Sequence, residues 1–186
     1  MARTSAATIA LLLVLSAEAG QSAPKARARP PAPPLASLCR PPEVPLFQCA
    51  ARTKQIALCA ANASAHAGVQ YRFGVPGKVE LAYPATPGAG QMRWAQAGYS
   101  GGGETQVSFQ TAGVTYVVYS RMIRTGFGSD GLNYPKEELG VAVVRDGRTL
   151  SDARCGLARI VGGNDDWIDE QRAMQLLRPG AFIHLD

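Results

Sequence analysis

Few of the residues that most often carry catalysis occur in this chain with the spacing of a known catalytic motif. The sequence holds two histidines, His66 and His184, and neither has a serine, cysteine or acid at a spacing typical of a nucleophile with its base. Gly98-Tyr99-Ser100-Gly101-Gly102 matches Gly-x-Ser-x-Gly in residue types, but a strand is expected after it, at 105–110, and not the helix that follows a nucleophilic serine in that motif. We therefore predict no catalytic residue from local motifs.

Acidic residues gather near the C-terminus, where a metal or acid/base site is one interpretation. Asp165, Asp166, Asp169 and Glu170 stand close together but lack the Asp-x-Asp-x-Asp-Gly spacing of a calcium loop. A helix beginning at this point explains them as well, because its N-terminus favours negative charge. We predict no metal and no cofactor.

The cysteines are more informative than the acids. There are four, Cys39, Cys49, Cys59 and Cys155, with no Cys-x-x-Cys pair of the kind that binds zinc. An even number of cysteines in an exported chain indicates two disulfides, and the residues themselves leave all three pairings open.

A serine followed by three glycines is the most unusual segment of the chain. It is not a phosphate-binding loop, because no Gly-Lys-Ser/Thr and no helix follow it. A flexible hairpin connection is one interpretation. The other is a protruding loop that enters the cleft of another protein, with these candidate binding residues: Tyr99, Ser100, Gly101, Gly102, Gly103 and Glu104.

The N-terminus has the three parts of a signal peptide. Arg3 gives a positive start, Ala6–Leu15 is apolar or neutral, and small residues at Ala17 and Ala19 predict cleavage before Gly20. The apolar run is too short for a membrane span, which needs about 20 residues. We therefore predict a signal peptide over 1–19 and a periplasmic or secreted protein with no membrane span.

Composition divides the rest of the chain in two. Residues 20–38 are rich in Pro, Ala and Arg and predict a disordered linker, and 39–186 predict a single folded domain. The net charge of +5 favours anionic partners such as an envelope polymer, although solubility alone also explains it. Export argues against a nucleic-acid partner.

Short segments of alternating apolar and polar residues, separated by Gly and Pro turns, predict a mostly β domain. We expect a small antiparallel barrel or sandwich of about eight strands, a polar loop over 124–138 and one C-terminal helix near 165–177, capped by Asn164 or Asp165. The expected strands lie at 46–49, 55–59, 69–73, 78–83, 92–95, 105–110, 114–120 and 140–144, with 148–155 as the closing segment.

Two resemblances follow from these motifs. The segments QYRFGVPGKVELAYP and VTYVVYS resemble a group of uncharacterised exported bacterial proteins. The order of Phe47-Gln48-Cys49, the Ser100 to Gly103 segment and Cys155 resembles the periplasmic and membrane-bound inhibitors of C-type lysozyme, which are small antiparallel barrels. This second resemblance implies that Cys49 bonds to Cys155, which leaves Cys39 for Cys59.

The inhibitor resemblance also implies a role for Ser100, whose hydroxyl would reach the carboxylates of the lysozyme active site. The chain departs from that family at Ala112, near which the family has a lysine that meets the same carboxylates, and at Glu104, which such a cleft would repel. Its positive charge also opposes encounter with a cationic lysozyme.

Our first hypothesis is therefore a non-enzymatic binding protein of the cell envelope, with 99–105 as its contact. The second is a secreted hydrolase whose site assembles from scattered carboxylates such as Glu80, Glu104 and Asp130, held about 5–10 Å apart across one cleft. The third is a purely structural envelope protein.

Overall fold

The computed structural model describes residues 36–62, 68–86, 91–156 and 167–186, all within one compact unit of the chain, Ala32–Asp186. These residues form ten strands and one helix, so the fold is mostly β, as predicted. The predicted signal peptide, 1–19, lies outside the described residues. So does the predicted linker, 20–38, apart from its last three residues.

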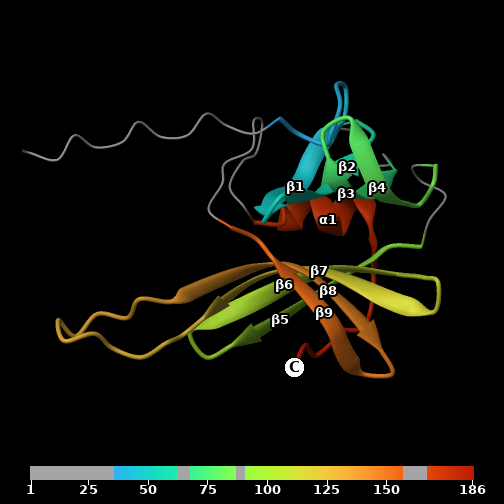
Figure 1. The fold of residues 1–186 in the computed structure, drawn as a ribbon. Helices are drawn as coiled ribbons and strands as arrows, with labels where there is room; N and C mark the ends of the chain where they lie inside the picture. Colours follow the sequence, from blue (N-terminus) through green and yellow to red (C-terminus); the bar gives the residue numbers. More distant parts are fainter. Residues whose placement is uncertain (1–35, 63–67, 87–90, 157–166) are drawn as a thin grey trace, which may run out of the picture. The chain divides into compact units, whose positions relative to one another are not determined.

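The first half of the unit folds into an antiparallel sheet of four strands in sequence order (Figure 1). Each strand pairs antiparallel with the next strand in the sequence. The strands are β1 (Val44–Ala51), β2 (Lys54–Ala60), β3 (Val69–Val75) and β4 (Lys78–Tyr83).

The second half forms a six-stranded sheet whose order is β10-β5-β6-β7-β8-β9. All neighbours are antiparallel except β10, which runs parallel to β5. The strands are β5 (Arg93–Tyr99), β6 (Gly102–Thr111), β7 (Val114–Ile123), β8 (Lys136–Arg145), β9 (Arg148–Arg154) and β10 (Arg178–Pro179).

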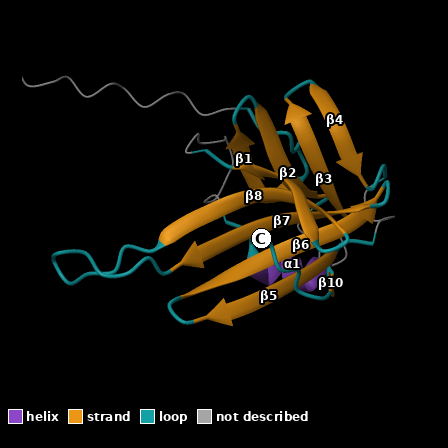
Figure 2. Ribbon diagram, turned by 60° about the horizontal axis from the view of Figure 1, so that its bottom comes forward, coloured by secondary structure: helices purple, strands orange, loops and turns teal. Residues whose placement is uncertain are grey.

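The two sheets do not close into a barrel. Within the described residues β4 pairs only with β3, and β5 pairs with β6 and β10, so no ladder joins the sheets. The barrel alternative is therefore wrong, and the arrangement is that of two facing sheets, as Figures 1 and 2 show. Ten strands replace the expected eight, because β9 and the short β10 are regular strands.

One apolar core lies between the sheets. It takes Leu46, Ile56 and Tyr71 from the first sheet and Val107 and Val118 from the second, all essentially inaccessible to solvent. Aromatic rings from both sheets line one part of this core. The ring centroids of Tyr83 and Phe109 are 4.3 Å apart, those of Phe109 and Tyr116 are 5.0 Å apart, and both pairs are stacked.

Helix α1 (Glu170–Leu176) lies between the two sheets in Figure 1. Asp169 caps it by accepting a hydrogen bond from the backbone N of Arg172 at 3.0 Å. The helix is shorter than the predicted 165–177, because Asp169 rather than an earlier residue begins it. The predicted caps, Asn164 and Asp165, lie outside the described residues. No helix of the described residues is long and apolar enough to cross a membrane.

The C-terminal residues follow the edge of the six-stranded sheet onto its outer face. Gly180 N donates to Trp94 O at 2.8 Å after β10. Ile183 and Leu185 then pack on a second, smaller apolar cluster that includes Val117 and Val144. This tail covers part of the face that points away from the four-stranded sheet.

Two disulfides join Cys39 to Cys59 and Cys49 to Cys155, the pairing implied by the inhibitor resemblance. The second links β1 to the residue after β9 and so ties the two sheets together. Ordered packing begins before Cys39, since Leu38 is buried against Ala57 and Cys59, and Ala36 O accepts a hydrogen bond from Gln55.

Candidate functional site

The glycine-rich segment between β5 and β6 is a tight turn. Tyr99 pairs with Gly102 across the hairpin, which leaves only Ser100 and Gly101 in the connection. Gly102, Gly103 and Glu104 belong to β6. A two-residue turn thus replaces the expected long loop over 99–105, and Tyr99, Ser100 and Gly101 are its exposed residues.

Two of the glycines have a steric reason for their place. Gly101 has a φ of +77°, a backbone conformation that residues other than glycine rarely adopt. At Gly102 an added Cβ would lie 2.0 Å from the backbone oxygen of Met122 on β7, so only glycine fits between these strands. Local backbone geometry therefore accounts for this part of the unusual sequence.

Glu104 was predicted to be a binding residue, but it is buried and not available to a partner. Its side chain is only 6 % exposed. Gln106 Nε2 donates to one carboxylate oxygen at 2.7 Å, and the Arg121 guanidinium lies 3.8 Å from the other. Burial is possible because these neighbours satisfy the charge.

Arg121 contacts two buried carboxylates, Glu104 and Glu138, in a charged cluster that we call the Arg121 network. Its guanidinium donates to Glu138 at 2.5 and 2.8 Å. Lys136 and Arg154 also contact Glu138, at 2.5 and 3.1 Å. The network therefore joins β6, β7, β8 and β9 across one face of the sheet, and its members are Glu104, Arg121, Lys136, Glu138, Asp152 and Arg154.

Three cations determine the ionisation of Glu138. Burial raises its pKa, but hydrogen bonds from Lys136 and Arg121 and the nearby charges of Arg121 and Arg154 outweigh it and bring the pKa down to about 2. Glu138 is thus a fixed negative charge at neutral pH. Since Arg121 lies near the end of β7 and Glu138 near the start of β8, this charge holds together the base of the segment that follows.

That segment, residues 124–135, extends the β7–β8 hairpin beyond the sheet, and we call it the arm (Figures 1 and 2). Its backbone is hydrogen-bonded within itself. Gly128 N donates to Leu132 O at 2.7 Å, and Thr125 Oγ1 donates to Tyr134 O at 2.6 Å. At the tip, Asp130 accepts from Leu132 N at 3.0 Å and from the Tyr134 hydroxyl. The arm is therefore an ordered hairpin that is held by its own hydrogen bonds.

Large apolar side chains stand exposed on the arm. Phe127 is 72 % exposed, Tyr134 60 % and Leu132 59 %, the three highest values among the large hydrophobic residues described. We expected a polar loop over 124–138, so these exposed apolar side chains were not predicted. The sequence does contain an indication of exposed apolar side chains here, because a loop of glycines and polar residues has no structural need for a Phe and a Leu.

The arm and the β5–β6 turn lie at the same end of the six-stranded sheet. An added Cβ at Gly101 would meet the Arg124 side chain at 2.2 Å, so the turn rests against the base of the arm. We call the turn (Tyr99–Gly102) and the arm together the contact end. Arg124 is exposed there and has no ion-pair partner among the described residues.

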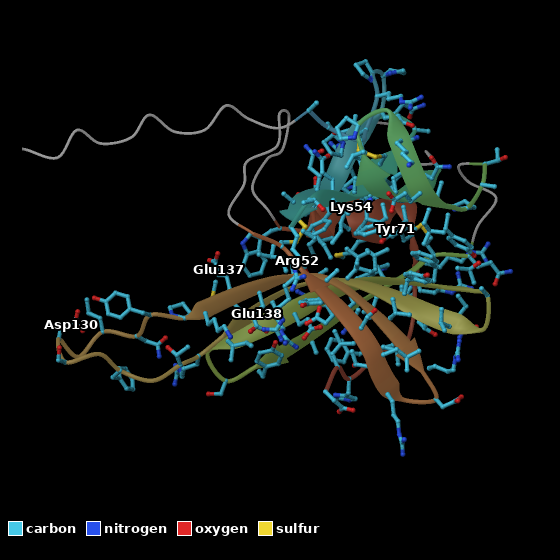
Figure 3. The ribbon with its side chains drawn as sticks, viewed as in Figure 1. Arg52, Lys54, Tyr71, Asp130, Glu137 and Glu138 are labelled. Carbon is cyan, nitrogen blue, oxygen red and sulfur yellow. A yellow bond between two sulfur atoms is a disulfide. The ribbon has the colours of Figure 1, made fainter. Side chains whose placement is uncertain are left out.

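The scattered carboxylates do not form a joint site. Glu80 on β4 pairs with Lys54, Glu104 is buried on β6, and Asp130 is at the arm tip, far from Lys54 in Figure 3. No group of three metal-binding side chains occurs within the described ranges. His184 packs edge-on against Phe182, whereas His66, Asp165 and Asp166 lie outside the described residues.

At the opposite end of the six-stranded sheet lies an open cleft of about 1050 Å³. It is bordered by the β6–β7 turn, the β8–β9 turn and the C-terminal tail. None of Glu80, Glu104 and Asp130 lines it.

Comparison with known proteins adds no assignment, since no protein-family model, curated protein or solved structure matches the chain.

Proposed function

We propose that this chain is a non-enzymatic binding protein of the periplasm or the cell exterior, and that its contact end binds a protein. The observation that carries the proposal is the exposure of Phe127, Leu132 and Tyr134 on an arm with a hydrogen-bonded backbone. Exposed aromatic and aliphatic side chains on an ordered projection are typical anchors of protein interfaces. The two disulfides favour an oxidising compartment.

The β5–β6 turn indicates what the partner offers. It presents the Ser100 hydroxyl, with the Arg124 guanidinium beside Gly101. A hydroxyl donor and a cation together suit a carboxylate, to which both make charge-assisted hydrogen bonds. In this proposal Arg124 provides the positive charge that the inhibitor resemblance places near Ala112. The partner is therefore a protein with an acidic cleft, and a C-type lysozyme is the specific form of the proposal.

Lysis of bacterial cells by a C-type lysozyme tests this specific form. We expect the full chain to slow lysis at micromolar concentration. Ser100→Trp, which blocks entry of the turn into a cleft, should abolish the effect. An unchanged lysis rate with the wild-type chain would end the lysozyme form and leave the wider proposal to the next experiment.

Capture of partners from bacterial envelope extract tests the contact end itself. The wild-type chain is compared with a Phe127→Ser/Leu132→Ser variant. Leu150→Ser is the matched control, because Leu150 is 55 % exposed but lies on β9, outside the contact end. We expect wild type and control to recover the same partner and the arm variant to lose it. Equal recovery by all three chains would refute the proposal.

A further inference from the structure

The open cleft at the far end of the six-stranded sheet is a second candidate site, independent of the contact end. Its volume of about 1050 Å³ exceeds the range of about 300–1000 Å³ usual for small-molecule pockets. The cleft therefore has room for an oligomeric ligand. The tail forms one wall through Ala181 and Ile183, and the turns at Gly113 and Gly147 form the rim.

Strand register sets the chemistry of the cleft floor. Arg93 pairs with Ser108 across β5 and β6, and Gln110 pairs with Thr115 across β6 and β7. All four line the cleft, together with Gln91 and Thr111. Hydroxyl and amide groups in such number are both donors and acceptors, which suits a ligand rich in hydroxyl groups. Tyr83, which is partly exposed, adds aromatic surface for the apolar face of such a ligand.

The charge of the cleft is positive. Arg93 and Arg145 line it against a single acid, Asp146. Neither arginine takes part in an ion pair within the described residues. Arg93 also lies directly across from Arg178 in the β10–β5 pairing, and like charges in register repel one another unless an anion lies between them.

We propose that this cleft binds an acidic oligosaccharide, with Arg93 and Arg145 on its carboxylate groups and the hydroxyl and amide side chains on its sugar hydroxyls. A guanidinium is suited to a carboxylate because it donates two parallel hydrogen bonds. The stem of Arg93 is held in place by Gly180, where an added Cβ would lie 2.5 Å from Arg93 Cβ. The stem of Arg93 on the cleft floor is therefore packed before a ligand arrives.

Titration of the full chain with defined oligosaccharides tests the proposal. The probes are an oligogalacturonate and a soluble peptidoglycan fragment, which carry carboxylates from different sources, and a chitin oligomer of equal length, which carries none. We expect binding of at least one acidic chain and at least tenfold weaker binding of the neutral one. The tighter of the two acidic probes identifies the source. Binding of neither, or equal binding of the chitin oligomer, would overturn the proposal.

Variants then place the site. Arg93→Gln and Arg145→Gln should each weaken binding of the acidic probe about tenfold, the usual effect of losing a charged hydrogen bond. Lys78→Gln removes the same charge from the four-stranded sheet and should have no effect. Equal melting temperatures confirm that each variant is folded. If Lys78→Gln weakens binding as much, or if a short polyphosphate binds as tightly as the saccharide, attraction is by net charge alone and the proposal fails.

Discussion

The side-chain amide of Gln106 forms two hydrogen bonds with the backbone of Ile183, 77 residues further along the chain. Nε2 donates to Ile183 O at 2.7 Å, and Oε1 accepts from Ile183 N at 3.0 Å. A buried side chain on the central strand β6 thus provides the tail with the pair of backbone hydrogen bonds that a neighbouring strand would otherwise provide.

This relationship predicts how the tail can be released. Gln106→Leu removes both bonds, together with the bond that Nε2 donates to the buried Glu104 carboxylate, and should cost about 1–3 kcal/mol of unfolding free energy. Carboxypeptidase should then remove the last residues faster than from the wild type. Gln96→Leu, at an exposed position on β5, is the control. Unchanged digestion of Gln106→Leu would mean that Ile183 and Leu185 hold the tail by packing alone.

The Arg121 network predicts loss of stability in acid. Glu138 has a pKa of about 2 in the folded chain, below its ordinary value of 4.5. A lowered pKa means that the charged form stabilises the fold above pH 4.5, and that this contribution is lost as the pH falls from 4.5 towards 2. Unfolding free energy measured by urea titration should decrease across that window.

The matching variant is Glu138→Gln. It leaves three cations without their shared carboxylate and should cost roughly 2–3 kcal/mol, less than a fully buried pair because Lys136 and Arg154 are more than half exposed. The acid-dependent loss should also become smaller. Glu137→Gln, which changes the exposed neighbouring residue, should leave both the unfolding free energy and its acid dependence unchanged. Identical acid profiles for wild type and Glu138→Gln would remove Glu138 as the cause.

Two adjacent glycines in the β5–β6 hairpin should differ in how much stability their replacement by alanine costs. Gly102→Ala places a Cβ against the Met122 carbonyl, forces β6 and β7 apart and should cost about 2 kcal/mol or more. Gly103→Ala places it 3.4 Å from Ala97 O and should change stability by no more than about 0.5 kcal/mol. Thermal unfolding of both variants measures the difference. Similar melting temperatures would contradict the close approach at Gly102.

The two disulfides should contribute unequally. The residues they join are 20 and 106 apart in sequence, and a longer closed loop constrains the unfolded chain more. Replacing Cys39 and Cys59 by alanine should cost about 3 kcal/mol, and replacing Cys49 and Cys155 about 4–5 kcal/mol. Denaturant unfolding compares the two double variants. A larger loss for the shorter loop would show that native packing dominates.

Periodicity was sufficient to predict the strands but not to predict which residues the fold would hide. The predicted strand 78–83 has the bounds of β4, because alternation and Pro84 mark it locally. Glu104 was expected at a contact surface. Its burial could not be predicted, because the partner that makes burial possible, Arg121, is 17 residues away in the sequence and no local pattern links the two. The tail after α1 has no periodic pattern, and the six-stranded sheet supplies its hydrogen bonds.

The contact end was predicted in part. The serine-glycine segment lies at the end of the sheet where we propose binding, but its loop is shorter than expected, since hairpin pairing absorbs Gly102 and Gly103. The arm was missed because exposure of Phe127 and Leu132 depends on how far β7 and β8 continue before they part. Sequence alone leaves that length open.

The disulfides are interleaved, since Cys49 lies within the loop closed by Cys39 and Cys59, and neither bond joins cysteines that are consecutive in sequence. A chain oxidised in the order of its synthesis brings Cys39 and Cys49 together first, and that pair is absent from the native protein. Correct maturation therefore requires either that Cys39 stay reduced until Cys59 is available and Cys49 until Cys155 is, or that an isomerase exchange an early bond.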